Sequence, residues 1–163
     1  MLRTCKTKIL CGVVRVAVKY QQEFLSQAEQ EVTPLAELEW EESGHPEHSL
    51  VIDWDSYFAL EEMGRLKFFT ARKDGLLVGY FVVIITSPFT TKGELVGSYE
   101  AVYVHKDHRK SMVARRLFKF VEECMKEDGI YRVIASSSAL NPIGKFLGRM
   151  GYGEVETKYE KVL

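Results

Sequence analysis

The hydrophobic pattern changes period along the chain, and its first part is helical. Apolar residues between positions 14 and 28 recur on one helix face, which predicts a helix over Val14–Glu31. The dipeptide Thr33-Pro34 is expected to end this helix, because the residue before a proline disfavours helical backbone. The loosely alternating segment Leu2–Leu10 predicts an edge strand ahead of the helix.

An acidic stretch, Glu37–His48, follows the first helix, and we interpret it as a helix end or a loop. A second short helix is expected after this stretch. Asp53 or Asp55 would cap its start and Gly64 would end it, since aspartate and glycine are favoured at these two places.

The middle of the chain carries the clearest strand pattern. Leu66–Arg72 and Leu76–Thr86 are predicted to be two strands joined by the hairpin turn Asp74-Gly75. The second of them is apolar on both faces, which predicts a central strand covered on both sides. A loop over Ser87–Gly93 leads to a third strand, Glu94–Val104.

In the last third of the chain, strands and helices alternate. The expected elements are a basic connection over His105–Ser111, a helix from Val113 that closes near Gly129, a strand over Tyr131–Ser136, a short helix from Asn141-Pro142 to Met150 that Gly151 ends, and a final extended pair or single strand over Tyr152–Leu163. This order predicts an α/β (mixed α+β) fold, in which a mixed sheet carries helices on its faces.

Composition limits the class of protein and its partners. The 163 residues fit one domain, 1–163, and the net charge of −1 gives no overall field that would recruit nucleic acid or membrane. The apolar run Leu76–Ile85 is shorter than the ~20 residues that span a bilayer. Three cysteines without a motif spacing, and an N-terminus without the layout of a signal peptide, favour a cytoplasmic protein. The sequence leaves open whether the chain is a monomer or a homodimer.

The stretch Tyr99–Phe120 carries the chemistry. A buried strand ends there, a basic loop follows, and a helix then begins. The first amides of such a helix lack partners and the helix dipole favours negative charge, so the junction predicts an anion site. The cations Arg109, Lys110, Arg115 and Arg116 surround it, and a diphosphate is the expected ligand.

These residues resemble the GNAT family of acetyltransferases, whose Arg/Gln-x-x-Gly-x-Gly/Ala loop holds the pyrophosphate of acetyl-CoA. Arg109 and Ala114 agree with this pattern, and Met112 stands where the central glycine is usual. The resemblance covers Leu66–Tyr152 and implies a mostly antiparallel sheet with a splay between its fourth and fifth strands. It also implies a set of residues that bind acetyl-CoA, namely Val102, Val104, Arg109, Lys110, Ser111, Met112, Val113, Ala114, Arg115 and Asn141.

The same resemblance suggests which groups move protons. Family members often hold a carboxylate on the strand before the loop, and Glu100 fits this base, with Glu94 a weaker rival. The tyrosine that often serves as general acid is replaced here by Leu147, so Tyr152 or Tyr131 is the candidate. The acidic stretch would form one wall of the acceptor cleft and attract a cationic amine.

Other polar groups have simpler interpretations. The pairs His45 with His48 and His105 with His108 have spacings that suit a metal, but neither has an evident third ligand, so no metal is expected. The serines 136–138 are interpreted as filler at a strand end, with contact between their hydroxyls and the cofactor as the alternative. No His or Asp context supports a nucleophile.

The sequence thus favours direct transfer of an acetyl group from acetyl-CoA to an amine. The alternative is a GNAT-shaped binding or structural protein that has lost catalysis, which the residues Met112 and Leu147 support.

Overall fold

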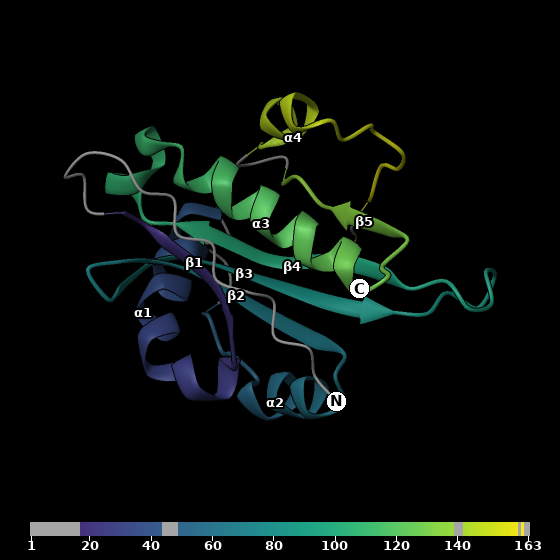
Figure 1. Ribbon diagram of the computed structural model, residues 1–163, viewed down its shortest axis with the longest axis horizontal. Coiled ribbons are helices and arrows are strands. Elements are labelled where there is room, and N and C mark those ends of the chain that lie inside the picture. The colour runs from purple at the N-terminus through teal and green to yellow at the C-terminus, as the bar shows by residue number, and fades with distance from the viewer. Residues whose placement is uncertain (1–16, 44–48, 139–141, 160, 162–163) are drawn as a thin grey trace.

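The computed structural model describes residues 17–43, 49–138, 142–159 and 161. One five-stranded sheet, in the order β1-β2-β3-β4-β5, separates two layers of helices (Figure 1). The elements are β1 Lys19–Glu23, α1 Leu25–Ser43, α2 Trp54–Glu62, β2 Leu66–Lys73, β3 Leu76–Thr86, β4 Val96–Val104, the 3₁₀ helix η1 Lys106–Ser111, α3 Val113–Glu127, β5 Arg132–Ala135 and α4 Gly144–Met150. The sheet is antiparallel except for the parallel pair β4 and β5, so the predicted mixed α/β fold is confirmed.

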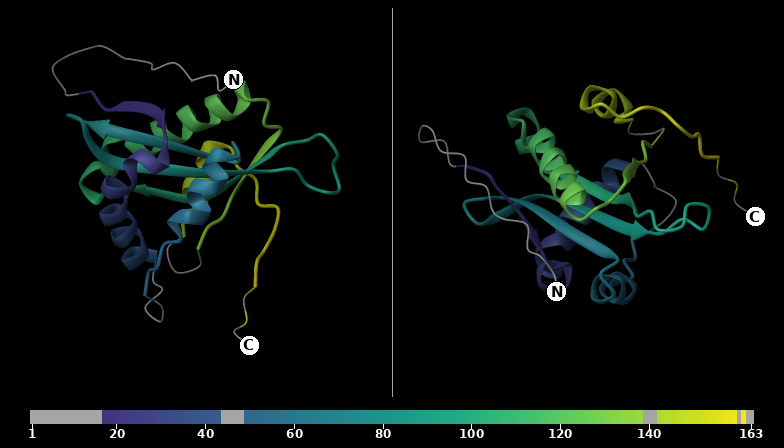
Figure 2. Two further views of the ribbon diagram at one scale, coloured as in Figure 1. Left: turned by 90° about the horizontal axis from the view of Figure 1, so that it is seen from below. Right: turned by 45° about the vertical axis from the view of Figure 1, so that its right-hand side comes forward.

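The two faces of the sheet carry separate cores. Helices α1 and α2 cover one face, while α3 and α4 lie over the other (Figure 2). Under α3, the ring of Phe81 meets Tyr99 and Phe118 edge-on, with ring centroids 4.5 and 4.8 Å apart. β3 is the central strand and is buried on both faces, as its continuous apolar pattern predicts.

The hairpin between β2 and β3 forms where the sequence places it. Asp74 and Gly75 adopt positive φ values of 53° and 82°, which the twist of a tight hairpin requires and which these residue types tolerate. The second helix is also confirmed. Asp53 caps it by accepting from the Ser56 amide at 3.1 Å, and Gly64 follows its end with φ 67°.

The prediction of a helix over Val14–Glu31, of which residues 14–16 lie outside the described part of the chain, is wrong in two ways. Residues 19–23 form the edge strand β1, because they pair antiparallel with β2 and because Glu23 binds Arg72 there. The helix begins only at Leu25, and it continues through Pro34 to Ser43.

A proline inside a helix costs ~3 kcal/mol or more, and burial along α1 offsets this cost. Four apolar side chains of α1 are buried against the sheet: Leu25, Ala28, Val32 and Leu35. Beyond the proline, Glu39 and Glu42 accept hydrogen bonds from the hydroxyls of Tyr80 and Tyr103. The acidic stretch up to Ser43 is therefore helix rather than loop.

The expected C-terminal strand is not found among residues 152–159 and 161, whose side chains are nearly all exposed and meet no sheet edge. The strand predicted over Leu2–Leu10 lies outside the described residues. Across the ranges that the structure describes, no helix has both the length and the apolar content needed to cross a membrane.

Candidate functional site

The sheet opens at one point on β4. β5 pairs with β4 over four positions only, and the pairing ends where Tyr99 faces Ala135. On the other side of β4, Val83 faces Tyr99 and Val82 faces Ala101, so Glu100 has no opposite residue and forms a β-bulge. Residues 100–104 of β4 therefore continue without a partner on β5, which is the predicted splay between the fourth and fifth strands.

A second feature lies where this part of β4 ends. The 3₁₀ helix η1 follows directly. Met112, between η1 and the first residue of α3, then adopts a left-handed conformation with φ 64° and ψ 7°. Glycine is the residue that adopts this conformation without strain, and it is glycine that the family usually has here. The Met112 side chain points outward and is 49% exposed.

After this turn, the first backbone amides of α3 are available to bind an anion. The first helical hydrogen bond of α3 runs from the Arg116 amide to the Met112 carbonyl at 3.0 Å. Within the described residues, no side chain caps α3 at its N-terminus, so the three amides of residues 113–115 keep their donor capacity. The side chains of Lys110, Ser111 and Arg115 are exposed around them, while that of Val113 is buried in the core.

Arg109 has a different place from the one expected. Its guanidinium donates to the Val104 carbonyl at 2.8 Å and to Glu42 Oε2 at 2.5 Å, and it lies 5.2 Å from the ring centre of Tyr103. It thus joins the end of β4 to the end of α1. Contact between Arg109 and a diphosphate stays a prediction.

Glu100 faces the layer of α1 and α2. Its carboxylate accepts a hydrogen bond of 3.4 Å from the Tyr57 hydroxyl of α2. Burial, followed by the nearby charge of Glu100 and this hydrogen bond, raises the pKa of Tyr57 to about 12, so this phenol is protonated at neutral pH. The rival carboxylate, Glu94, precedes β4 by two residues, whereas Glu100 lies at the middle of the strand.

Glu39 is a carboxylate that the sequence analysis did not single out. Burial raises its pKa, hydrogen bonds from the Tyr80 hydroxyl and the Val102 amide counteract this in part, and the charges of Glu42 and Glu100 raise it further. One signal was available in the sequence. Tyr80 and Tyr103 are hydroxyl-bearing residues in otherwise apolar strands, and they sit opposite each other in the register.

The proposed acids lie elsewhere. Tyr152 is on the α3 face, where its hydroxyl donates to Glu122 at 2.6 Å and lies 2.8 Å from the Tyr99 hydroxyl. Burial, then these two hydrogen bonds, raises the pKa of Tyr152 strongly. Tyr131 is 70% exposed and precedes β5 at the end away from the splay, so the structure does not bring it to Glu100.

The remaining candidates form no site in the described part of the chain. His105 and His108 lie with ring centres 6.2 Å apart, and no group of three or more potential metal ligands occurs among the described residues. His45, His48 and Asn141 fall outside them. Ser137 accepts a hydrogen bond from the Ile143 amide at 2.9 Å and so positions the start of α4.

Comparison with known proteins identifies the family. Residues 23–152 match the model of the acetyltransferase (GNAT) family, and the chain therefore belongs to it. A search of curated protein sequences finds no significant match.

Several solved structures share the fold, each matched over 90% of this chain. They include an aminoglycoside acetyltransferase from an uncultured soil metagenomic sample, with TM-score 0.72, 12% identity and 96% of that chain covered. A ribosomal-protein-alanine N-acetyltransferase from Brucella melitensis biovar Abortus 2308 has TM-score 0.68, 20% identity and 99% coverage. A glucosamine-6-phosphate N-acetyltransferase from Arabidopsis thaliana has TM-score 0.68, 17% identity and 98% coverage. These identities establish the shared fold and leave the acceptor to be argued from the site.

Proposed function

We propose that this protein transfers an acetyl group from acetyl-CoA directly to the nitrogen of an amine. The observation that carries the proposal is the continuity of the site along one strand. A carboxylate at the Glu100 bulge, an edge of β4 without a strand partner, and the uncapped start of α3 follow one another within fifteen residues, 100–114.

The residues fit acetyl-CoA by their chemistry. The amides at the start of α3 and the cations Lys110 and Arg115 would hold the pyrophosphate. The Val102 amide already donates to Glu39 and the Val104 carbonyl already accepts from Arg109. The remaining backbone groups of these two residues, on the open edge of β4, would hold the pantetheine arm as a strand partner does. An amide on this edge would also polarise the thioester carbonyl.

Glu100 would accept the first proton of the ammonium, which frees the nitrogen to bond to the acetyl carbon. As the carbon–sulfur bond then breaks, the nitrogen releases its second proton to solvent and the sulfur leaves as a thiolate. The departing thiolate needs a proton, and Tyr152 is the candidate donor that lies on the α3 face next to Tyr99. Holding amine and thioester in one geometry would supply much of the rate gain.

A GNAT-fold binding protein without catalysis is the second candidate. Leu147 favours this second candidate. Its side chain is buried in the core, at the position where family members often carry the tyrosine that serves as general acid. The two candidates share acetyl-CoA binding and differ in turnover.

Thermal unfolding in the presence of acetyl-CoA tests the proposal. A ligand at a hundredfold excess over its Kd stabilises the folded state by ~2.7 kcal/mol, which corresponds to a rise in Tm of roughly 5–10 °C for a chain of this size. Acetate alone should produce no shift. The absence of a shift at millimolar acetyl-CoA would overturn the proposal. A shift without release of the CoA thiol in the presence of any amine would favour the binding protein.

A further inference from the structure

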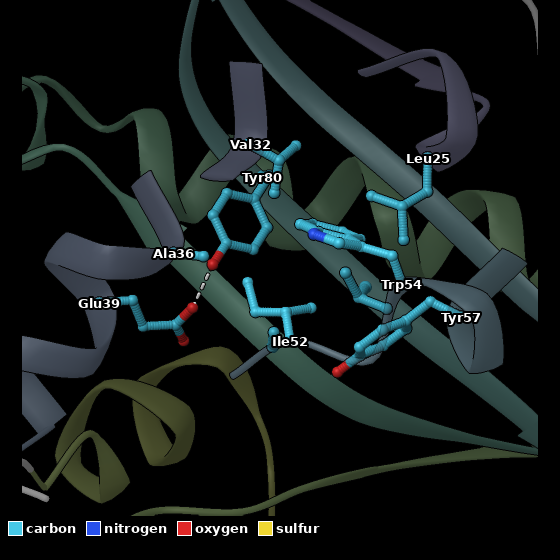
Figure 3. Close-up of a pocket in the computed structure, with 10 residues that line it drawn as sticks. Leu25, Val32, Ala36, Glu39, Ile52, Trp54, Tyr57 and Tyr80 are labelled. Carbon is cyan, nitrogen blue, oxygen red and sulfur yellow. Dashed lines mark hydrogen bonds between the residues drawn. The ribbon is translucent and has the colours of Figure 1, made fainter. Parts of the chain in front are cut away.

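A cavity of about 110 Å³ lies between the sheet and the helices α1 and α2 (Figure 3). Its walls are aliphatic and aromatic apart from one carboxylate, that of Glu39. The lining residues are Leu25, Val32, Ala36, Ile52, Trp54, Tyr57, Tyr80, Val82 and Ala101. Ala101 is the chain neighbour of Glu100, so the floor of the cavity adjoins the bulge on which the proposed base lies.

The cavity has an apolar body and a negative rim. In Figure 3 the Glu39 carboxylate points toward the Tyr80 hydroxyl, from which it accepts a hydrogen bond. Tyr57 lines the cavity and donates to Glu100, and the charges of both Glu100 and Glu39 act on its hydroxyl. Glu42, the third carboxylate, already has the cation Arg109 as its partner. The net negative charge therefore lies with Glu39 and Glu100.

The walls of the cavity are held in place by a contact between its two helices. Glu61 of α2 accepts hydrogen bonds from the first amides of α1, at 2.5 Å from Leu25 and 3.1 Å from Ser26, and also from the Ser26 hydroxyl at 2.7 Å. This carboxylate caps α1 and complements its dipole. The cavity is thus preformed, and a ligand that enters it avoids the cost of ordering its walls.

Resting on the proposed function for the identity of the reaction, we infer that the acceptor is a primary amine carrying one compact apolar group. The apolar group enters the cavity, and the ammonium lies at its rim between Glu39 and Glu100. An apolar cavity of about 150 Å³ holds a benzene-sized molecule, so a cavity somewhat smaller fits a group on the order of four to five carbons. Loss of a proton to Glu100 then leaves the amine beside the open edge of β4.

The same walls disfavour other amines. A polyhydroxylated acceptor would bury hydroxyls against aliphatic side chains that offer them no partner. A phosphorylated or carboxylated amine would bring a further anion to a rim that already holds the carboxylates of Glu39 and Glu100. The site therefore selects against sugar amines and amino acids, by desolvation in the first case and by charge in the second.

Binding to the full-length wild-type chain tests the inference, with tryptophan fluorescence as the readout because Trp54 lines the cavity. The probes share one body and differ in head group: 3-methylbutylamine, 3-methylbutan-1-ol and 3-methylbutanoate. Ethylamine shares the head group and lacks the body. We expect 3-methylbutylamine to bind at least tenfold more tightly than each of the other three. Equal affinities of ethylamine and 3-methylbutylamine would overturn the inference.

Two variants locate the binding. Ala36→Leu fills the cavity and should reduce the affinity for 3-methylbutylamine to that for ethylamine, whereas Ala59→Leu, on the exposed face of α2, is the matched control and should bind as wild type does. Glu39→Gln keeps an acceptor for the Tyr80 hydroxyl and leaves Glu100 in place, so it should reduce the preference for the amine over the alcohol. Ala36→Leu binding at wild-type affinity would overturn the inference, as would an unchanged preference in Glu39→Gln.

These measurements use no acetyl-CoA, so the inference and the proposed function can fail separately. Selective amine binding without any effect of acetyl-CoA on Tm would overturn the proposed function and retain the cavity as an amine site. A positive effect of acetyl-CoA together with unselective amine binding would overturn the inference alone.

Discussion

Arg109 and Glu42 join the C-terminal end of β4 to the C-terminal end of α1 through a contact of 2.5 Å between guanidinium and carboxylate. Both side chains are partly exposed, at 43% and 32%, so the ion pair itself contributes at most about 1 kcal/mol to stability. Its importance lies in position, because the same guanidinium also holds the Val104 carbonyl beside the open edge of β4.

Arg109→Ala should weaken acetyl-CoA binding by roughly 1–3 kcal/mol, the usual effect of losing a hydrogen bond to a charged group. Glu42→Gln is the matched variant. It removes the competing anion and keeps an acceptor, so it should bind acetyl-CoA as well as the wild type or more tightly. Calorimetric titration measures both. Normal binding by Arg109→Ala would show that the loop of residues 109–114 has been misassigned.

Met112 provides a test of backbone strain. A non-glycine residue in the left-handed region costs roughly 1–2 kcal/mol, and glycine avoids this while losing part of the gain to its greater freedom in the unfolded state. We expect Met112→Gly to raise the free energy of unfolding by about 0.5–1 kcal/mol in urea, and acetyl-CoA affinity to be unchanged or improved.

Two further substitutions control this measurement. Met112→Ala keeps the Cβ atom and the strain, and it should stay close to wild type because the side chain is half exposed. Met112→Val should be less stable, since a β-branched residue tolerates positive φ poorly. If glycine and alanine gave the same stability, strain at this position would be refuted.

Glu23 predicts how stability depends on pH. Burial alone would raise its pKa, but hydrogen bonds from Arg72, Thr70 and Gln21 outweigh burial and lower the pKa from 4.5 to about 2. A group whose pKa is lower in the folded state stabilises the protein above its unfolded pKa, and this stability disappears as pH falls toward the folded pKa.

We therefore expect the wild type to lose up to about 3 kcal/mol of stability from Glu23 between pH 4.5 and 2. Glu23→Gln should lack this part of the pH dependence in urea unfolding followed by circular dichroism. Glu31→Gln also removes a carboxylate that binds Arg72, but this carboxylate is 49% exposed and contributes less. The variant should therefore keep most of the dependence of stability on pH. Identical slopes in wild type and Glu23→Gln would contradict the assignment.

Local patterns predicted the elements whose cause is local. The continuous apolar run of β3, the turn at Asp74-Gly75 and the one-sided face of α3 each specify their structure within a few residues. β1 could not be predicted in this way. Residues 19–23 become a strand because Arg72, about fifty positions later, pairs with Glu23. A partner so far along the chain leaves no periodic pattern within the segment from which it could be predicted.

The candidate site, too, could be predicted only where its parts are contiguous in the sequence. The junction of strand, basic loop and helix was visible as a contiguous sequence, and Met112 was found as an exception to a short pattern. The cavity was not visible, because its walls come from α1, α2, β3 and β4, and because Pro34 was expected to end α1 before Ala36 and Glu39. The assignment of 1–163 to one domain stays a prediction, as does the monomeric or dimeric state.

The structural and the chemical role of Tyr152 can be tested separately. Tyr152→Phe and Tyr99→Phe each remove one hydroxyl from the same hydrogen-bonded chain and should each cost about 1 kcal/mol of stability. Only Tyr152→Phe should lower kcat, if its hydroxyl protonates the departing thiolate. The raised pKa keeps Tyr152 protonated, so wild-type turnover should not fall from its ionisation below pH 10. Equal kcat values for the two variants would leave Tyr152 a purely structural residue.

Glu100 gives the decisive test of chemistry. Its carboxylate lies at the bulge, on the face of α1 and α2 and away from the start of α3, so it would contact the amine and not the diphosphate. Glu100→Gln preserves size and an acceptor for the Tyr57 hydroxyl but cannot take a proton. We expect turnover to fall by about 10²–10⁴-fold, the usual contribution of a general base, with acetyl-CoA affinity unchanged.

Glu94→Gln, two residues before β4 begins, is the matched control and should turn over at the wild-type rate. The assay measures release of the CoA thiol with a panel of small alkylamines, polyamines and lysine peptides, with the three proteins side by side. A rate for Glu100→Gln equal to that of an active wild type would remove Glu100 from the mechanism. A general base also predicts that the loss shrinks as pH rises, because an amine that is already deprotonated in solution needs no acceptor for its first proton. A loss independent of pH would instead indicate that Glu100 acts by attracting the ammonium.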